Sequence, residues 1–235
     1  MPEVQDPIIV NRLLVDLPSQ DRAAMLHGCR TVELEFGTVL SAPEQVFREV
    51  YFPLSALISL VATVPGHPAL EMGMIGNEGM LGATLLLGTS VAPLQAVVQG
   101  PGTALRMSAA QLRRELGTRA ALRATLGRYL YVLTAQLTQS AACTRFHEVD
   151  ERLARWLLMT HDRSHADHFR LTHQFLADML GVQRSAVTIA AGALQRKKVI
   201  RYARGEITVL SRKGLEAASC ACYGAVADEY RRWFN

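Results

Sequence analysis

The spacing of hydrophobic residues predicts helices first and strands afterwards. Residues 8–30 have the spacing of short helices, and Ser19 is placed to cap the second one. Beyond them Val32, Leu34 and Phe36 alternate with glutamates, which is typical of a half-buried strand. Further short hydrophobic runs, separated by turns rich in proline and glycine, cover residues 46–53, 56–64, 69–76 and 94–100. This pattern predicts an N-terminal β-roll or jelly roll.

From Ser108 the spacing becomes helical, and a long helix is expected around residues 118–145. Its large hydrophobic residues recur at intervals of three and four, with pairs seven apart, as in helices that pair with another helix. One interpretation is a helix that lies on the sheet of its own subunit. We favour a helix that pairs with a second copy of the chain. The residues of this expected dimerisation seam are Leu122, Leu126, Tyr129, Leu130, Leu133 and Leu137.

The C-terminal third carries the pattern of a helix-turn-helix followed by a hairpin. Thr172 can cap a first helix, Gly181 permits the positive backbone angle of a tight turn, and a second helix is expected over residues 184–198. The inward residues would be Phe175, Leu176, Met179, Leu180, Val182, Val187, Ala190, Ala191 and Leu194. A hairpin over residues 200–210, which turns at Arg204-Gly205, would form a wing beside these helices.

Charge is concentrated in the same region. The chain has 49% hydrophobic and 20% charged residues, which is ordinary globular composition, and a net charge of +4. Residues 1–146 have equal numbers of acidic and basic side chains, so the whole excess falls in residues 147–235. Residues 184–213 contain eight basic side chains and a single acidic one, Glu206. Such an excess suits a polyanion, although a solvated basic face would give the same count.

A helix-turn-helix places the N-terminal end of its second helix in the major groove of DNA. The base-reading candidates are therefore Gln183, Arg184, Ser185 and Thr188. Among these, Arg184 has the fork of donors that binds guanine O6 and N7 together. Candidates for contacts with the DNA backbone, which position the protein without reading sequence, are Thr172, His173, Arg196, Lys197, Lys198, Arg201, Tyr202 and Arg204.

At this point the chain resembles the Crp/Fnr superfamily of transcription regulators along nearly its whole length. The most specific stretch is FLADMLGVQRSAVTIAAGALQRKKVIRY. The resemblance implies an α+β chain in three parts: a sensor domain like a cyclic-nucleotide-binding domain over 1–117, a dimerisation helix over 118–146, and a winged helix-turn-helix over 147–235. Arg184 falls where the family has a base-reading arginine. Ser185 and Ile189 differ from the residues of cAMP-binding members, so their operator sequence is not transferred.

The stretch that corresponds to the family's phosphate cassette is MIGNEGMLGATLLLGTSVAPLQAVV. Ala83 aligns with the glutamate that holds the ribose, and Pro93-Leu94 align with the arginine-serine pair that holds the cyclic phosphate. No arginine lies between Arg48 and Arg106, so a cyclic phosphate would lack its bidentate partner. We therefore expect no tight binding of cAMP and leave an unknown small-molecule effector open. The degenerate effector pocket comprises Gly79, Gly82, Ala83, Pro93 and Leu94.

Metal and redox chemistry have weaker signals. An iron–sulfur sensor needs clustered N-terminal cysteines, whereas this chain has only Cys29 there. Residues 161–169 are expected to form a polar connection after a helix over 147–163. The histidines of this connection, with Asp162 and Asp167, could bind a metal. These histidines are His161, His165 and His168. A lone histidine could also be an axial ligand of haem. Cys220 and Cys222 would need two further ligands for structural zinc, so free thiols are favoured over zinc or a redox role.

The sequence favours a regulator over an enzyme. The strands lack the paired histidines and carboxylate of a metal-dependent cupin, and the chain has no Gly-rich phosphate loop and no G-x-S-x-G motif. A protein-interaction module with an incidental basic tail is the other alternative. With neither a signal peptide nor a hydrophobic run long enough to span a membrane, we expect a cytoplasmic homodimer that binds double-stranded DNA, with RNA polymerase as a further candidate partner and no membrane partner.

Overall fold

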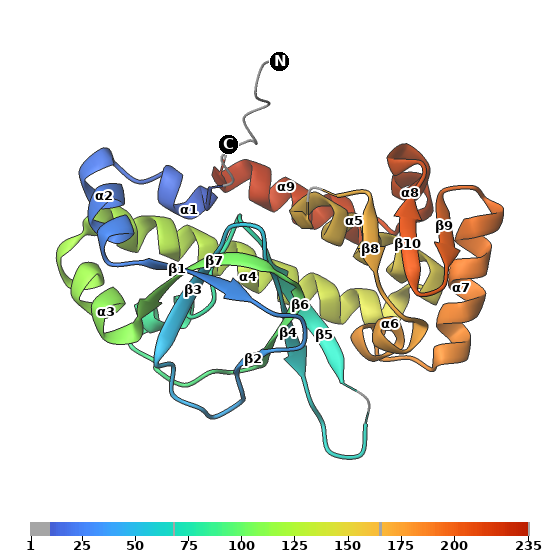
Figure 1. Cartoon of the computed structure of the whole chain (residues 1–235), viewed down its shortest axis with the longest axis horizontal. Helices are drawn as coiled ribbons and strands as arrows, with labels where there is room; N and C mark the ends of the chain where they lie inside the picture. Colours follow the sequence, from blue (N-terminus) through green and yellow to red (C-terminus); the bar gives the residue numbers. More distant parts are fainter. Residues whose placement is uncertain (1–9, 68, 165, 235) are drawn as a thin grey trace.

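A computed structural model of the chain describes residues 10–67, 69–164 and 166–234. The fold is α+β, as predicted: a sheet region and a winged helical region lie along the long helix α4 (Ala120–Phe146) (Figure 1). Within these residues no helix is long and apolar enough to cross a bilayer.

The N-terminal region contains two antiparallel sheets with strand orders β1-β7-β3 and β2-β6-β4-β5. The strands are β1 (Arg30–Leu34), β2 (Val39–Ser41), β3 (Glu49–Pro53), β4 (Leu57–Ala62), β5 (Leu70–Ile75), β6 (Gln95–Gly100) and β7 (Gly102–Ser108). The helices are α1 (Arg12–Val15), α2 (Ser19–His27), the 3-10 helix η1 (Ala83–Leu87) and α3 (Ala109–Thr118). The two sheets agree with the predicted β-roll.

Three local expectations for this region need correction. Ser19 is the first residue of α2, and Pro18 occupies the capping position without a side-chain hydrogen bond. Strand β1 ends at Leu34, and Phe36 lies beyond it, 54% exposed. The hydrophobic pattern does not predict β7, although this strand lies between β1 and β3 and holds their sheet together. The strand begins at Gly102, inside the Pro101-Gly102 pair that predicts a turn, so the turn signal hides the strand.

The C-terminal region has the predicted winged helix-turn-helix. Its elements are α5 (Val149–Ser164), β8 (His168–Arg170), α6 (His173–Leu180), α7 (Arg184–Arg196), β9 (Ile200–Ala203), β10 (Glu206–Val209), α8 (Arg212–Ala218) and α9 (Cys222–Phe234). Strand β10 pairs with β9 and also with β8. Much of the stretch 161–169 is therefore regular structure, whereas a polar connection was expected. The short strand β8 was not predicted because its three residues include only one buried apolar side chain, Phe169.

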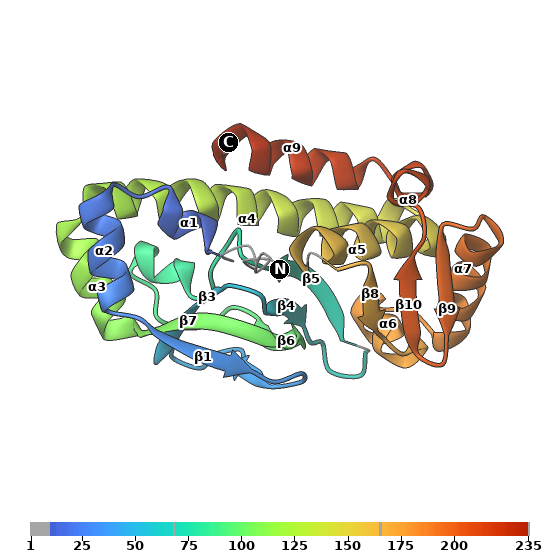
Figure 2. The same ribbon diagram turned by 45° about the horizontal axis from the view of Figure 1, so that its top comes forward.

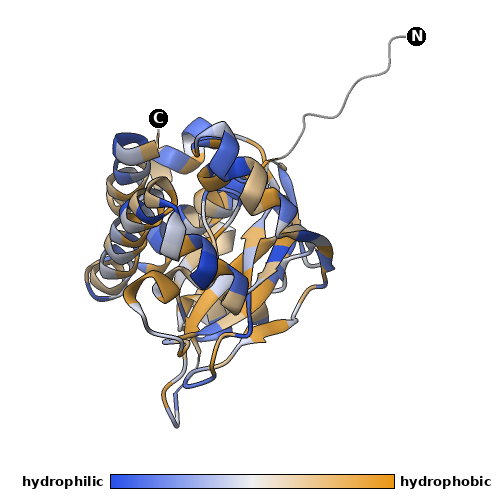
Figure 3. Cartoon of the chain, turned by 90° about the vertical axis from the view of Figure 1, so that its left-hand side faces the viewer, coloured by the Kyte–Doolittle hydropathy of each residue, from blue (hydrophilic) through white to orange (hydrophobic). Residues whose placement is uncertain are grey.

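After the wing the chain turns back, and α9 runs along α4 (Figure 2). The rings of Tyr131 on α4 and Trp233 on α9 meet edge to face, with centroids 5.8 Å apart. Hydrophobic residues are concentrated in the strands, whereas the helices carry hydrophilic residues on part of their surface (Figure 3). This distribution is expected when amphipathic helices cover a sheet.

Helix α5 joins the two regions. Its side chains are buried continuously from Arg152 to Thr160, and its apolar residues share one cluster with Val61 of β4 and Met74 of β5. At its end the guanidinium of Arg163 binds the carboxylate of Glu78 at 2.6 Å, with both side chains mostly buried. The winged helix is thus packed directly against the sheet region.

A polar group also lies at this junction. The carboxylate of Glu71 on β5 accepts a hydrogen bond from Ser59, and Gln99 donates to Thr160 of α5 at 3.2 Å. Burial raises the pKa of Glu71 to about 7, against the opposing effects of the Ser59 hydrogen bond and the charge of Arg155. Native Glu71 therefore binds a proton more readily than it does in the unfolded chain.

This raised pKa gives a testable pH dependence. Between the ordinary carboxyl pKa and about 7, the native state holds more protons at Glu71 than the unfolded state, so this group's contribution to the free energy of unfolding falls as pH rises through that window. We expect the difference in free energy of unfolding between Glu71→Gln and the original chain to be more favourable to the variant at pH 8 than at pH 5. Urea denaturation at the two pH values measures this difference. Exposed Glu35→Gln is the matched control, and equal differences at both pH values would contradict the assignment.

Candidate nucleic-acid interface

The turn between α6 and α7 has the geometry that its sequence predicts. The hydroxyl of Thr172 caps α6 by accepting a hydrogen bond from the backbone N–H of Phe175 at 3.1 Å. Gly181 has φ 62° and ψ 40°, in the left-handed region that glycine tolerates. The N–H of Val182 then donates to the carbonyl of Ala177 at 3.0 Å, which closes the turn. These bonds set the angle between the two helices.

One face of each helix forms the core of this unit. The buried residues are Leu176, Ala177, Met179 and Leu180 on α6 and Val187, Ala190, Ala191 and Leu194 on α7, as predicted. Phe175 is only half-buried. The centroid of its ring lies 5.5 Å from that of Phe36, which follows β1, and 6.4 Å from that of Trp156 on α5, so Phe175 also connects α6 to the sheet region.

The opposite face of α7 is exposed at its N-terminal end, where Gln183, Arg184, Ser185 and Thr188 are all on the surface. The Thr188 hydroxyl is already bound within the protein: it donates to the carbonyl of Arg184 at 3.1 Å and lies 2.9 Å from Nδ1 of His173. Its methyl group remains for contact with a ligand. Ile189, in the next position, is 71% exposed.

Further basic side chains lie at the C-terminal end of α7, where Arg196 is followed by Lys197 and Lys198, and on the wing. Arg196, Lys197, Lys198, Arg201 and Arg204 are all exposed. Positive φ angles at Arg204 (53°) and Gly205 (81°) are those of a type I′ turn, the two-residue hairpin connection that matches strand twist. The sequence-predicted basic residues are therefore exposed at both ends of α7 and on the wing.

His173 and Tyr202 join α6 to the wing. Their rings stack with centroids 4.2 Å apart, and the N–H of Tyr202 donates to Oε1 of Gln195 on α7 at 2.8 Å. Burial, and then the nearby charge of Arg184, lower the pKa of His173. The neutral imidazole is thus favoured, and we interpret His173 as a group that positions the wing as well as one that can reach a phosphate.

The residues of the expected dimerisation seam separate into two groups. Leu122, Leu126 and Tyr129 are at most 1% exposed and belong to the core of their own subunit. Placing these three at a subunit interface was wrong, because helical spacing alone does not tell which apolar face lies on the sheet. Half-buried positions of the seam do remain on α4, and these are Leu130, Leu133 and Leu137.

The same half-buried leucines line a cavity of about 360 Å³ between α4 and the N-terminal sheet region. Gly82, Ala83, Pro93 and Leu94 also line it, as the sequence predicts. Gly79 does not: a Cβ there would lie 2.4 Å from the hydroxyl oxygen of Tyr129, so this glycine permits the close approach of α4. The described residues that line the cavity carry no charge, and its polar side chains are Thr84, Tyr131 and Thr134.

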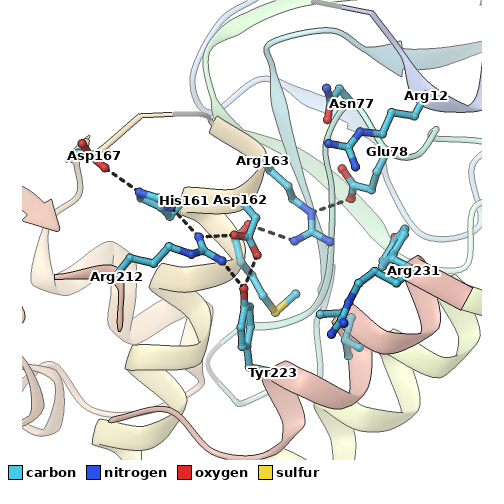
Figure 4. Close-up of a pocket in the computed structure, with 14 residues that line it drawn as sticks. Arg12, Asn77, Glu78, His161, Asp162, Arg163, Asp167, Arg212, Tyr223 and Arg231 are labelled. Atoms are coloured by element: carbon cyan, nitrogen blue, oxygen red, sulfur yellow. Dashed lines mark hydrogen bonds and ion pairs between the residues drawn. The ribbon is translucent and has the colours of Figure 1, made fainter. Parts of the chain in front are cut away.

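The histidines expected to be open to a metal role are held in other ways. Nδ1 of His161 accepts from Arg212 at 2.9 Å, and Nε2 then donates to Asp167 at 2.7 Å (Figure 4). His168 lies on β8, where its Nε2 is 3.8 Å from Oε1 of Glu206. His165 lies outside the described residues. His161 instead belongs to a polar network along a cavity of about 650 Å³ between α5, α8 and α9.

Arg212 and Asp162 form the centre of that network. The guanidinium of Arg212 binds Asp162 at 2.6 Å and donates to the hydroxyl of Tyr223, also at 2.6 Å, while this hydroxyl donates to Asp162 at 2.9 Å (Figure 4). These bonds fasten α8 and α9 to the end of α5. Because Asp162 and Arg212 are far apart along the chain, no signal in the sequence identifies them as partners.

Comparison with known proteins agrees with this architecture. Residues 151–218 match the Crp-like helix-turn-helix domain family, and no curated protein matches the chain. FixK2 from Bradyrhizobium japonicum is 14% identical, with a TM-score of 0.69 over 82% of this chain and 98% of its own. A CRP/FNR-family transcriptional regulator from Thermus thermophilus is 23% identical, with a TM-score of 0.66 over 81% and 98%. The c-di-GMP-responsive global regulator CLP of Xanthomonas campestris is 16% identical, with a TM-score of 0.66 over 83% and 100%.

The uncharged cavity leads to a prediction about cyclic nucleotides. A cyclic phosphate would lose its hydration there without gaining an arginine partner, so the transfer is unfavourable. We expect isothermal titration calorimetry with cAMP to show no binding in the micromolar range. Micromolar affinity would contradict this account of the cavity.

Proposed function

We propose that this chain, which carries a Crp-like helix-turn-helix domain on the fold of the Crp/Fnr transcription regulators, binds a palindromic operator in double-stranded DNA as a homodimer. The observation that carries the proposal is the exposed N-terminal end of α7 with Arg184, together with exposed basic residues at the C-terminal end of the same helix and on the wing. Major-groove recognition needs this combination: side chains that reach base edges, and cations that bind the flanking phosphates.

The roles divide along this surface. Arg184, with Gln183 and Ser185 beside it, would read base edges, and Thr188 would contribute its methyl group because its hydroxyl is bound within the protein. Contacts with the DNA backbone would come from Thr172, His173, Arg196, Lys197, Lys198, Arg201, Tyr202 and Arg204. These contacts are sequence-independent and make affinity depend steeply on salt.

Dimerisation would use the face of α4 that the subunit's own sheet leaves half-buried, around Leu130, Leu133 and Leu137. We keep the division into a sensor over 1–117, a dimerisation helix over 118–146 and a winged helix over 147–235. The same leucines line the sensor cavity, so an uncharged effector bound there would touch the proposed interface. Such contact is a route by which an effector could change the angle between the two winged helices. Binding, not catalysis, is the proposed activity.

Selection from random duplex DNA at two salt concentrations tests the proposal. We expect a palindromic motif with half-sites about one helical turn apart and enrichment that falls steeply at the higher salt. Enrichment without a motif would indicate phosphate contacts alone, and would contradict sequence reading by the chain as isolated. Absence of binding at low salt would favour a protein-interaction module.

Replacing Arg184 tests the base-reading role. Arg184→Ala should weaken operator binding by about 1–3 kcal/mol and relax the preference at one base pair in each half-site. Lys197→Ala is the comparison, since loss of a phosphate contact should weaken all sequences about equally and reduce the salt dependence. Titration of operator variants by fluorescence anisotropy measures both. An unchanged preference in Arg184→Ala would remove this residue from base reading.

A further inference from the structure

We propose that Cys143, His147, Cys220 and Cys222 form a zinc site where the long helix α4 meets the start of α9. The sequence alone offers only Cys220-x-Cys222, two ligands short of a tetrahedral set. Folding supplies the other two from the end of α4: Cys143 lies in its last turn, and His147 is the residue that follows the helix.

The geometry of the four donor atoms fits a single ion. All of them lie within 4.8 Å of one another. Sγ of Cys143 is 3.5 Å from Sγ of Cys220, and Sγ of Cys222 is 3.5 Å from Nδ1 of His147. Zinc–sulfur bonds of about 2.3 Å and zinc–nitrogen bonds of about 2.0 Å put tetrahedral ligand atoms about 3.5–3.8 Å apart. The observed separations therefore need only small adjustments to close around zinc.

The surroundings also suit such a site. The three cysteines are at most 5% exposed and form a cluster apart from the two hydrophobic cores, while His147 is half-buried. The amide of Gln139 donates to Sγ of Cys222 at 2.9 Å, a bond of the kind that orients a thiolate ligand.

The local charge balance agrees with an occupied site. Zinc with three thiolates and a neutral imidazole carries one net negative charge. Two mostly buried cations of α5, Arg152 and Arg155, both interact electrostatically with Cys143. A buried anionic centre would compensate these guanidinium groups, which are costly to bury without a counter-charge.

Two other chemistries fit less well. A disulfide between Cys143 and Cys220 would require the sulfur atoms to approach to about 2.05 Å, and it would leave Cys222 and His147 without a role. An iron–sulfur cluster spreads its thiolates around several iron and sulfide atoms, whereas here all four donors lie within the span of one ion.

The site would fix the joint between the sensor and the DNA-binding unit. Its ligands come from the last turn of α4, from the residue after it, from the connection between α8 and α9, and from the first residue of α9. Zinc would thus hold both ends of the winged helix against the proposed dimerisation helix. This consequence, though not the metal site itself, rests on the proposed function.

Metal analysis of the purified full chain tests the site. We expect about one zinc per chain by inductively coupled plasma mass spectrometry, and loss of zinc in Cys143→Ser and Cys220→Ser. Cys29→Ser is the matched control, since Cys29 is half-buried near β1 and outside the cluster. Reduced protein that neither contains zinc nor takes up added zinc would overturn the proposal, as would an iron–sulfur absorption spectrum.

A milder variant and a second metal cover the case in which a cysteine variant fails to fold. Cobalt(II) bound to the original chain should give the intense d–d and thiolate charge-transfer bands of a tetrahedral, sulfur-rich site. Gln139→Ala, which keeps all four ligands, should weaken zinc affinity about 10-fold to 100-fold. An octahedral cobalt spectrum without thiolate bands would contradict the site. Unchanged zinc affinity in a folded Gln139→Ala would contradict the orienting role of the Gln139 hydrogen bond.

The regulatory consequence is measured separately. Operator affinity is measured before and after a chelator removes the zinc. We expect it to fall at least several-fold on removal. If zinc is bound but DNA affinity does not change on its removal, the site stands and the coupling is wrong. If the chain binds zinc but no DNA, the proposed function fails while the metal site remains.

Discussion

The double burial of α5 is the constraint on which the arrangement of this protein depends. A helix buried along most of its length must pack against partners on more than one side, and α5 does so with the core of the winged helix and with the N-terminal sheet that contains β4 and β5. Val61 and Met74 of that sheet pack in the same cluster as Leu153 and Leu157. Because packed interiors resist continuous deformation, the winged helix cannot turn relative to the sheet without opening this cluster.

Polar contacts then select one orientation from those that burial alone would allow. Arg163 of α5 and Glu78 form a mostly buried ion pair at the end of the helix, and Gln99 donates a hydrogen bond to Thr160, about one turn before that end. Buried polar groups are costly when they lose their partners. A shifted α5 would separate these partners, so the contacts penalise alternative packings more strongly than they stabilise the observed one.

The C-terminal helix extends this restraint to the region proposed to form the dimer. Helix α9 lies along α4, and the cysteine cluster joins the two where α4 gives way to α5. The uncharged cavity is lined by the neighbouring face of α4. One helix therefore contacts this cavity, the candidate metal site and the proposed dimer interface, which gives changes at any of these places a short path to the winged helix.

The sequence by itself determined the features that depend on local chemistry. Thr172, Gly181 and the Arg204-Gly205 turn lead to the winged helix-turn-helix because capping and positive backbone angles are properties of a few neighbouring residues. Tertiary structure alone decided which face of α4 is buried, since Leu122 and Leu130 look alike in a helical pattern. It also decided that Cys143 and His147 meet Cys220 and Cys222, because contacts between distant segments depend on how whole helices pack.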